Sequence, residues 1–257
     1  MPKDRGIENV ERYFGNFIKL VEDKIRKKGK VKILDAGCGY GVAMMGFLKR
    51  FGNKVEIIGY NYSSNDGNTK IMKQQAVKRK IFTKQELSKI KKFPKFYYID
   101  ASKKLPFKNN EFDFIYSMAS IYLYDKKIKF LEECNRILKK DGLARISPTF
   151  NMDTKKIKNK IGNCKPGYYM KYWEIWDKGK EIQIENYCKK IKGVKAVWGN
   201  KYKGDKPMYI EIIGNGKVDF KLQFISSIDY NFIWKDWGGV KSIYTTQKKF
   251  RPKWKSK

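Results

Sequence analysis

A short apolar segment that runs into a glycine-rich turn constrains the fold of this chain more than any other feature. Residues 31–36 (VKILDA) predict a buried strand, and residues 42–51 (VAMMGFLKRF) predict a helix. Gly37, Gly39 and Gly41 lie between them, where they allow a tight turn and let backbone N–H groups approach a ligand without an intervening side chain. Such a turn at a helix N-terminus favours anionic or carboxylate groups. The segment therefore predicts a strand–loop–helix unit that either binds a ligand or serves only tight packing.

Four further apolar runs continue the alternation of strands and helices. They predict strands at 55–60, 96–99, 112–117 and 143–147. Each run is close to continuously apolar, which is typical of a parallel sheet covered by helices on both faces. An amphipathic helix at 6–28 precedes them. These patterns predict an α/β fold.

The pattern changes in the second half of the chain. A helix is expected from about Asp125 to Asp141–Gly142, with an apolar stripe that includes Leu138. Further elements are predicted as a helix near 181–191, strands at 194–199 and 207–214, a turn at Asn215–Gly216 and a strand at 218–226. The turn and the strands around it predict a hairpin.

The composition excludes several kinds of chemistry. The 257 residues include no histidine, so Ser-His-Asp and Cys-His nucleophiles, a histidine base and histidine-containing zinc sites are ruled out. The cysteines are scattered, at Cys38, Cys134, Cys164 and Cys188. Their spacing contains no CxxC pair, so we expect neither a metal site nor a disulfide framework.

The chain is strongly basic, with 58 Lys+Arg against 26 Asp+Glu and a formal charge of +32. Such a chain attracts polyanions. Lysine, Ile, Asn, Tyr and Phe have AT-rich codons, so genomic base composition is an alternative source of the charge. The start lacks an apolar leader, and no run of 18 apolar residues occurs. We therefore expect a cytoplasmic protein without a membrane span.

The glycine-rich segment has the pattern Asp35-x-Gly37-x-Gly39-x-Gly41. A dinucleotide fingerprint would need glycine where Val42 stands. The pattern resembles instead the first motif of class I S-adenosylmethionine (SAM) dependent methyltransferases.

The resemblance continues in order along the chain. It includes Asp100-Ala101, LPFKNNEFDFIYS at 105–117 and FLEECNRILKKDGLARIS at 130–147, and it is nearest to the type 11 branch of the family. The resemblance implies a Rossmann-like fold with a seven-stranded, mostly parallel sheet flanked by helices, and SAM as cofactor. It assigns cofactor binding to Asp35, Ala36, Gly37, Cys38, Gly39, Gly41, Asn61, Tyr62, Asp100, Ala101, Ser117 and Tyr122. Asp100 is implied to contact the adenine amino group.

Two departures from the family pattern bear on the site. Asn61 stands where relatives carry an acidic residue that binds the ribose hydroxyls, and the loss of a charge-assisted bond costs about 1 kcal/mol or more. Weaker SAM binding, substitution by Asp66 and a different ligand remain alternatives, and we expect Asn61→Asp to tighten SAM binding. Tyr122 stands where many relatives carry histidine; it either packs or lines the methyl-donor end of the site.

We expect a methyltransferase domain at 1–214, with its motif core at 31–147 and a substrate lid at 148–180, followed by a basic, aromatic, β-rich extension at 215–257. Methyl transfer by in-line displacement depends mainly on orienting donor and acceptor. The absence of histidine is therefore compatible with it. The catalytic residue is not determined; Tyr122, Asp125 and Glu174 are candidates, although Asp125 also suits a helix N-cap.

Three functions remain open for the chain. The first is methylation of RNA or another nucleic acid, with a polyanion held by the basic and aromatic residues of 151–180 and 218–257. The second is methylation of a small-molecule acceptor beneath an aromatic lid. The third is a catalytically silent binding protein, for which Asn61 is the only indication. The sequence favours the first.

Overall fold

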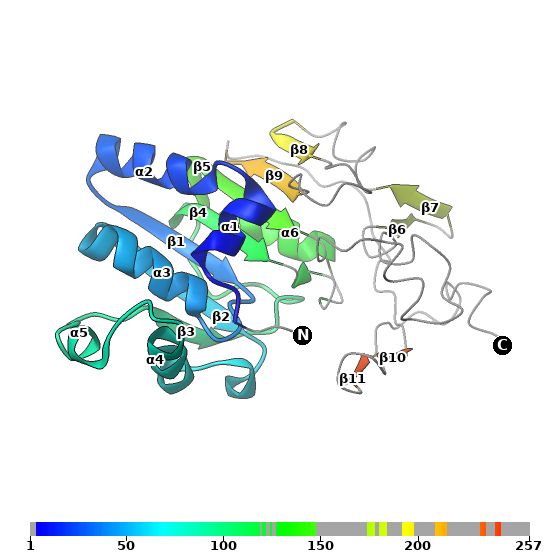
Figure 1. The fold of residues 1–257 in the computed structure, drawn as a ribbon. Coiled ribbons are helices and arrows are strands. Elements are labelled where there is room, and N and C mark those ends of the chain that lie inside the picture. The colour runs from blue at the N-terminus through cyan, green and yellow to red at the C-terminus, as the bar shows by residue number, and fades with distance from the viewer. Residues whose placement is uncertain are drawn as a thin grey trace.

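A computed structural model describes residues 4–118, 120–121, 124, 127–147, 174–177, 180–183, 192–197, 209–214, 232–234 and 240–242. The main body is a seven-stranded sheet with the strand order β3-β2-β1-β4-β5-β9-β8. Its strands are β1 (Val31–Ala36), β2 (Val55–Asn61), β3 (Lys95–Tyr98), β4 (Phe112–Met118), β5 (Leu138–Ser147), β8 (Val194–Val197) and β9 (Tyr209–Ile213). Strands β1 to β5 are parallel, whereas β9 runs antiparallel to both β5 and β8. The predicted α/β, Rossmann-like, mostly parallel sheet is confirmed (Figure 1).

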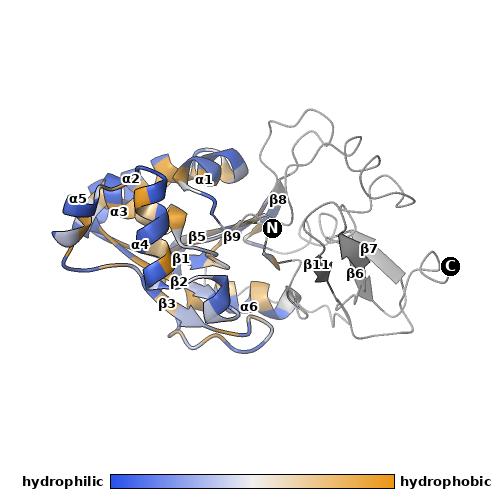
Figure 2. Cartoon of the chain, turned by 60° about the horizontal axis from the view of Figure 1, so that its bottom comes forward, coloured by the Kyte–Doolittle hydropathy of each residue, from blue (hydrophilic) through white to orange (hydrophobic). Residues whose placement is uncertain are grey.

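Helices cover both faces of the sheet. They are α1 (Ile7–Phe14), α2 (Phe17–Lys28), α3 (Val42–Phe51), α4 (Thr69–Lys78), α5 (Lys84–Ser88) and α6 (Lys127–Ile137), with short 3₁₀ turns at Gly52–Lys54 and Ser64–Asp66. Ile33 of β1 packs with α1 to α4 in one core, and its neighbour Leu34 packs with α6 in the other. Consecutive strand residues therefore point to opposite faces, and the apolar residues lie along the strands and the inner helix surfaces (Figure 2).

The single helix predicted at 6–28 is wrong, because the chain breaks between α1 and α2. Gly15 has φ +64°, a left-handed value that ends α1. The buried guanidinium of Arg145 on β5 donates to the carbonyl oxygen of Phe14 and, at 2.9 Å, to Oδ1 of Asn16. Periodicity missed the break because apolar residues keep helical spacing across it, whereas the bonds that hold it come from a strand more than 100 residues away.

The predicted helix at 125–141 also ends earlier than expected. α6 stops at Ile137, and Leu138 pairs with Phe112 as the first residue of β5. The register of β5 against β4 then shifts, and Asp141 takes φ +62°. The backbone N–H of Asp141 donates to the carbonyl of Gly214 at 2.7 Å, which shows that this irregular stretch is paired within the sheet.

The strands predicted at 194–199 and 207–214 are confirmed for β8 (Val194–Val197) and β9 (Tyr209–Ile213), and residues 198–208 lie outside the described residues. Two antiparallel pairs are also described: β6 (Glu174–Asp177) with β7 (Lys180–Gln183), and β10 (Phe232–Trp234) with β11 (Val240–Ser242). Residues 181–183 belong to β7, so the helix predicted near 181–191 is wrong for them. The turn at Asn215–Gly216 and most of the lid and the extension lie outside the described residues, and the domain boundaries stay predictions. In the part of the chain that the structure describes, no helix is long and apolar enough to cross a membrane.

Candidate cofactor site

The glycine-rich loop lies at the carboxyl edge of the sheet, between β1 and α3. β1 is flanked there by β2 and β4, which places the loop at the point where the strand order reverses and α/β proteins bind ligands. The N–H groups of Gly37 and Cys38 both donate to the carbonyl of Tyr60 at 3.0 Å. Gly37, Gly39 and Gly41 have φ values of +80°, +54° and +75°. These backbone angles explain why the loop needs glycine.

Asp35, the last residue but one of β1, carries a buried carboxyl group. It is 1% exposed and accepts a hydrogen bond from the Tyr116 hydroxyl at 2.7 Å. Burial raises the pKa of Asp35 to about 7, although the Tyr116 hydroxyl favours the carboxylate. A cationic group bound beside it would stabilise the ionised form. Burial also raises the pKa of the Cys38 thiol well above its usual value, which leaves Cys38 unreactive near neutral pH.

Asn61, at the end of β2, forms a two-way clamp on the glycine-rich loop. Its Oδ1 accepts from the N–H of Gly39 at 2.8 Å, and its Nδ2 donates to the carbonyl of the same residue at 2.9 Å. Nδ2 also donates to the carbonyl of Gly67 at 3.4 Å. The side chain is 4% exposed, so these bonds are made away from water. The structure therefore gives Asn61 a loop-shaping role that sequence comparison did not predict.

The segment after β2 folds back over the glycine-rich loop. A Cβ placed on Gly67 would lie 1.9 Å from the carbonyl oxygen of Gly39. Only glycine fits there. Tyr62, predicted to bind the cofactor, is 78% exposed, and Asp66, the alternative ribose ligand, lies in the Ser64–Asp66 turn and accepts from Ser63 Oγ at 3.3 Å.

The Asp100–Ala101 pair follows β3 on the same edge of the sheet. The N–H of Ile99 donates to the carbonyl of Asn61 at 2.8 Å, so this pair stands directly beside the end of β2. Asp100 Oδ1 accepts from the N–H of Ser102 at 2.9 Å, and Oδ2 lies 3.7 Å from Lys103 Nζ. The Asp100 side chain is 36% exposed and Ala101 is buried. The predicted acidic residue is thus accessible at the site.

A chain of buried hydroxyl groups covers the first turn of the glycine-rich loop. Ser117 Oγ, at the end of β4, lies 2.5 Å from Ser120 Oγ, which donates to the carbonyl of Ala36 at 2.9 Å. Ser120 Oγ is 3.0 Å from Tyr124 Oη, and Tyr124 Oη is 3.3 Å from Tyr60 Oη. Burial raises the pKa of both phenols, so they remain neutral.

This hydroxyl chain was only partly visible in the sequence. A Cβ on Gly37 would lie 2.5 Å from Ser120 Cβ, which shows how closely the chain packs on the loop. Sequence analysis named Ser117 and missed Ser120, Tyr124 and Tyr60. The run SMASIYLY, dense in hydroxyls after a predicted strand, was the available signal.

An internal ion pair fixes the loop that follows Asp100–Ala101. Glu133 of α6 is 3% exposed; its Oε2 accepts from the N–H of Leu105 at 2.8 Å and from Arg136 Nη2 at 2.6 Å. Arg136 also donates to the carbonyls of Leu105 at 3.0 Å and Phe107 at 2.8 Å. Burial acts to raise the pKa of Glu133, but the bonds from Arg136 and Leu105 outweigh it and lower that pKa. These contacts join the family-like segment at 105–117 to the one at 130–147.

The three candidate catalytic residues are not brought together by the described structure. Tyr122 and Asp125 lie outside the described residues. Glu174 belongs to β6, and its side chain lies outside the described part. Within the described residues, no group of three or more Cys, Asp or Glu residues is arranged to hold a metal ion.

The residues at this edge fit S-adenosylmethionine in their chemistry. SAM carries a sulfonium and an ammonium, which suit the carboxyl group of Asp35, and an adenine amino group, which suits the accessible carboxylate of Asp100. It also carries a carboxylate, which suits the N-terminus of α3. The loop also leaves no room for side chains: a Cβ on Gly41 would lie 2.8 Å from Met44 Cε and 2.9 Å from Phe96 Cζ.

The sheet order and the glycine-rich loop at the carboxyl end of β1 define a Rossmann-like fold of the class I methyltransferase type. Residues 34–146 match the family model described as "Methyltransferase domain". This segment, which contains the loop, Asn61 and Asp100, is therefore a methyltransferase domain of the SAM-dependent family.

A curated relative, the sarcosine/dimethylglycine N-methyltransferase of Aphanothece halophytica, is 28% identical over 121 residues. The match covers 47% of this chain and 39% of the relative, so the chain spans well under half of that protein. A solved structure described as a candidate sarcosine dimethylglycine methyltransferase of Galdieria sulphuraria is 23% identical, with a TM-score of 0.36 and coverage of 50% and 43%. A candidate SAM-dependent methyltransferase of Methanococcus maripaludis is 16% identical, with a TM-score of 0.48 and coverage of 84% and 96%.

Proposed function

We propose that the chain transfers a methyl group from SAM to the nitrogen of a small-molecule amine. The glycine-rich loop, Asp35, Asn61 and Asp100 lie together at the carboxyl edge of the sheet. This edge belongs to the segment that matches the methyltransferase family, and this observation supports the proposal most strongly. The amine acceptor is suggested by the N-methyltransferase relative, whose similarity spans 121 residues. This reverses the preference for nucleic acid that the sequence alone gave.

The chain's own residues bind and orient the reactants. When bound, SAM supplies a methyl group activated by its sulfonium. The buried carboxyl of Asp35 lies beside the glycine-rich loop, where a bound cationic group would favour its ionised form, and Asp100 provides an accessible acceptor at the end of β3. Asn61 holds Gly39 in place through both of its backbone groups. Correct placement is the main contribution an enzyme makes to such a displacement.

An amine acceptor suits a chain without histidine. The lone pair of a neutral amine attacks the methyl carbon as the carbon–sulfur bond breaks, and the new ammonium releases its proton to water afterwards. No strong base is needed at the moment of transfer, in contrast to a phenol or an acidic carbon. Tyr122, Asp125 and Glu174 stay candidates for groups that line the acceptor side.

A second candidate function is methylation of RNA, and the charge of +32 favours it. Its proposed contact segments are 151–180 and 218–257, which fall largely outside the described residues. The two functions differ in their response to salt. Binding of RNA weakens steeply as salt rises, whereas methylation of a small amine changes little.

Methyl-labelled SAM tests the proposal when the full chain is incubated with sarcosine, with an extract of small metabolites and with total RNA. We expect label in the small-amine fraction. The rate of labelling should fall about tenfold in Asp100→Asn, the effect of one lost charged contact. Glu11→Gln, an exposed change on α1, serves as the control with unchanged activity. Label in RNA that disappears at high salt would establish the second function, and absence of transfer with retained SAM binding would indicate a silent binding protein.

A further inference from the structure

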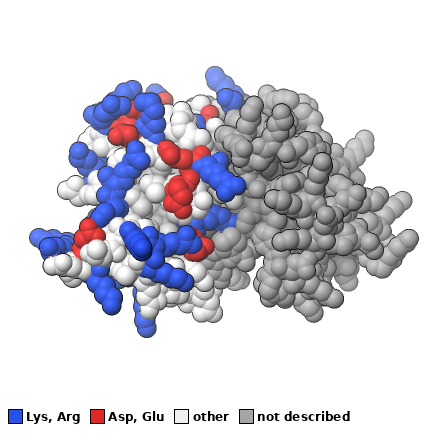
Figure 3. Space-filling view, in the orientation of Figure 1, with Lys and Arg blue, Asp and Glu red and all other residues white. Residues whose placement is uncertain are grey.

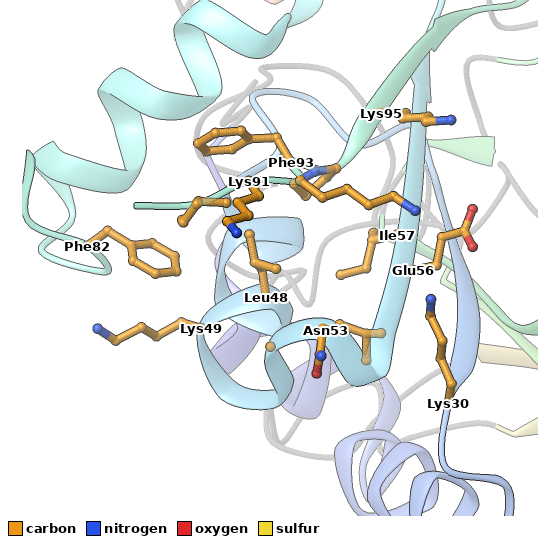
Figure 4. A pocket seen from close by; sticks show the side chains of 15 residues that line it. Lys30, Leu48, Lys49, Asn53, Glu56, Ile57, Phe82, Lys91, Phe93 and Lys95 are labelled. Atoms are coloured by element: carbon orange, nitrogen blue, oxygen red, sulfur yellow. The ribbon is translucent and has the colours of Figure 1, made fainter. Parts of the chain in front are cut away.

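A cavity of about 400 Å³ lies at the amino edge of the sheet, opposite the candidate cofactor site. Its walls come from the end of α3, the start of β2 and the segment between α5 and β3 (Figure 4). The cavity touches Val55, Glu56 and Ile57 at the beginning of β2, whereas the glycine-rich loop contacts Asn61 at the end of the same strand. The two sites therefore occupy opposite ends of one strand.

The floor of this cavity is apolar. Leu48 of α3 and Ile57 of β2 form its centre, and the rings of Phe82 and Phe93 stand at its side (Figure 4). Phe82 and Ile57 are buried, and Leu48 and Phe93 are half-buried. A volume of about 400 Å³ falls within the range of pockets that bind small molecules, roughly 300–1,000 Å³.

Lysines surround the apolar floor: Lys30, Lys49, Lys91, Lys92 and Lys95. Lys49 forms a salt bridge with Glu86, and the distance from Lys49 Nζ to Glu86 Oε1 is 2.5 Å. Glu56, the one acidic lining residue, lies 3.4 Å from Lys32 Nζ.

The other four lysines are exposed, and none of them forms a salt bridge with a described residue. Figure 3 shows Lys and Arg predominating over the described part of one face, with acidic side chains scattered among them. The cavity therefore has an apolar floor and a surplus of positive charge at its rim.

We propose that this cavity binds a small amphipathic anion, with an aromatic or branched apolar body and one carboxylate, sulfonate or phosphate group. The apolar body would contact Leu48, Ile57 and the two phenylalanine rings, and the anion would meet the ammonium groups at the rim. A nucleic-acid backbone is a poorer match, because it needs a charged track and stacking rings instead of one apolar hollow. The proposal does not depend on methyl transfer.

The test uses the full chain and 8-anilinonaphthalene-1-sulfonate, a fluorescent aromatic sulfonate. We expect saturable binding that weakens about tenfold in the double variant Lys91→Gln/Lys92→Gln, which removes two ammonium groups near the anion. The matched control is Lys140→Gln/Lys195→Gln, two exposed lysines outside the cavity, and it should bind as the unaltered chain does. A third variant, Leu48→Trp, fills the floor and should abolish binding while the far-ultraviolet circular dichroism stays unchanged.

Three outcomes would overturn the proposal. The first is equal affinity of the two lysine double variants, which would show that bulk charge attracts the probe. The second is displacement of the probe by SAM, which would place it at the carboxyl edge of the sheet. The third is displacement by single-stranded RNA together with loss of RNA affinity in Lys91→Gln/Lys92→Gln, which would assign the cavity to nucleic acid.

Discussion

Replacing Asn61 with aspartate tests how the end of β2 and the glycine-rich loop are held together. The substitution keeps the size of the side chain but exchanges its NH₂ donor for a second carboxylate oxygen. In the folded chain that donor faces the carbonyl oxygens of Gly39 at 2.9 Å and Gly67 at 3.4 Å. The aspartate would keep the bond from the Gly39 N–H and would turn the other two contacts from attractive into repulsive.

The magnitude follows from the burial of the clamp. A buried acceptor that loses its donor costs about 1–3 kcal/mol, and the short bond to Gly39 accounts for most of this. Charge repulsion raises the pKa of the new carboxyl group. The unfolded chain would have an aspartate pKa of about 3.9. When the pKa is higher in the folded chain, the group stabilises the fold fully below pH 3.9, and this stabilisation is lost as the pH rises through the pKa of the folded chain. We therefore expect a loss of about 2–3 kcal/mol at pH 8 and a smaller loss at pH 5.

Urea unfolding, followed by circular dichroism at both pH values, measures this loss. Asn65→Asp is the matched control, because Asn65 is exposed on the same segment and the charge change is identical. A surface substitution of this kind should change stability by no more than about 0.5 kcal/mol. Calorimetry with SAM supplies the second readout. Because Asn61 clamps the glycine-rich loop, we expect weaker binding by Asn61→Asp, in place of the tighter binding expected from the family pattern. If Asn61→Asp were as stable as the control and bound SAM more tightly, the clamp would be refuted and the ribose role expected from sequence would stand.

Three other substitutions test parts of the same framework. The pKa of Asp35 rises from 3.8 in the unfolded chain to about 7 in the folded one, so its contribution to the free energy of unfolding is fully present below pH 3.8 and is lost as the pH rises to 7. The loss is at most about 4 kcal/mol. Asp35→Asn should abolish this pH dependence in urea titrations. Arg145→Met leaves Glu211, 2.7 Å away and 13% exposed, without its partner and also removes the bonds to Phe14 and Asn16, so it should cost about 3 kcal/mol. In a double-mutant cycle, Glu211→Gln should restore only the part that comes from the unpaired carboxylate. In Gly67→Ala the new Cβ would lie 1.9 Å from the carbonyl oxygen of Gly39, so the substitution should lower the melting temperature strongly. Gly52→Ala is the control, because its Cβ meets open space and the only cost is that of φ +57°, about 1 kcal/mol. The melting temperature of Gly67→Ala should lie well below that of the control.

The sheet could be predicted closely from the sequence where the information is local. β1 matches its predicted bounds, and β2 and β4 match theirs within one residue. A short, continuous apolar run bounded by polar turns is compatible with few structures other than a buried strand. The break after Phe14 could not be predicted, because it depends on hydrogen bonds from Arg145. The early end of α6 depends on the pairing of Leu138 with Phe112, which is also a long-range contact.

The site was predictable in position more than in role. The glycines follow from a local pattern whose left-handed backbone angles require them, and Asp35 is the first residue of the same pattern, in β1. Asn61 was placed correctly at the end of β2, yet its partners are backbone groups of Gly39 and Gly67 that only the folded chain brings within reach. The family resemblance assigns the position of Asn61 to ribose binding, but it cannot show that the amide there forms hydrogen bonds with the glycine-rich loop instead.

Calorimetric titration of the full chain with SAM measures whether the edge of the sheet at the glycine-rich loop binds this cofactor. We expect binding of one SAM per chain and no binding of NAD⁺, because Val42 interrupts the dinucleotide pattern after the glycine-rich loop. The product S-adenosylhomocysteine should compete for the same site. Absence of heat with SAM at millimolar concentration, or equal binding of NAD⁺, would contradict the assignment of this edge of the sheet as a methyltransferase cofactor site.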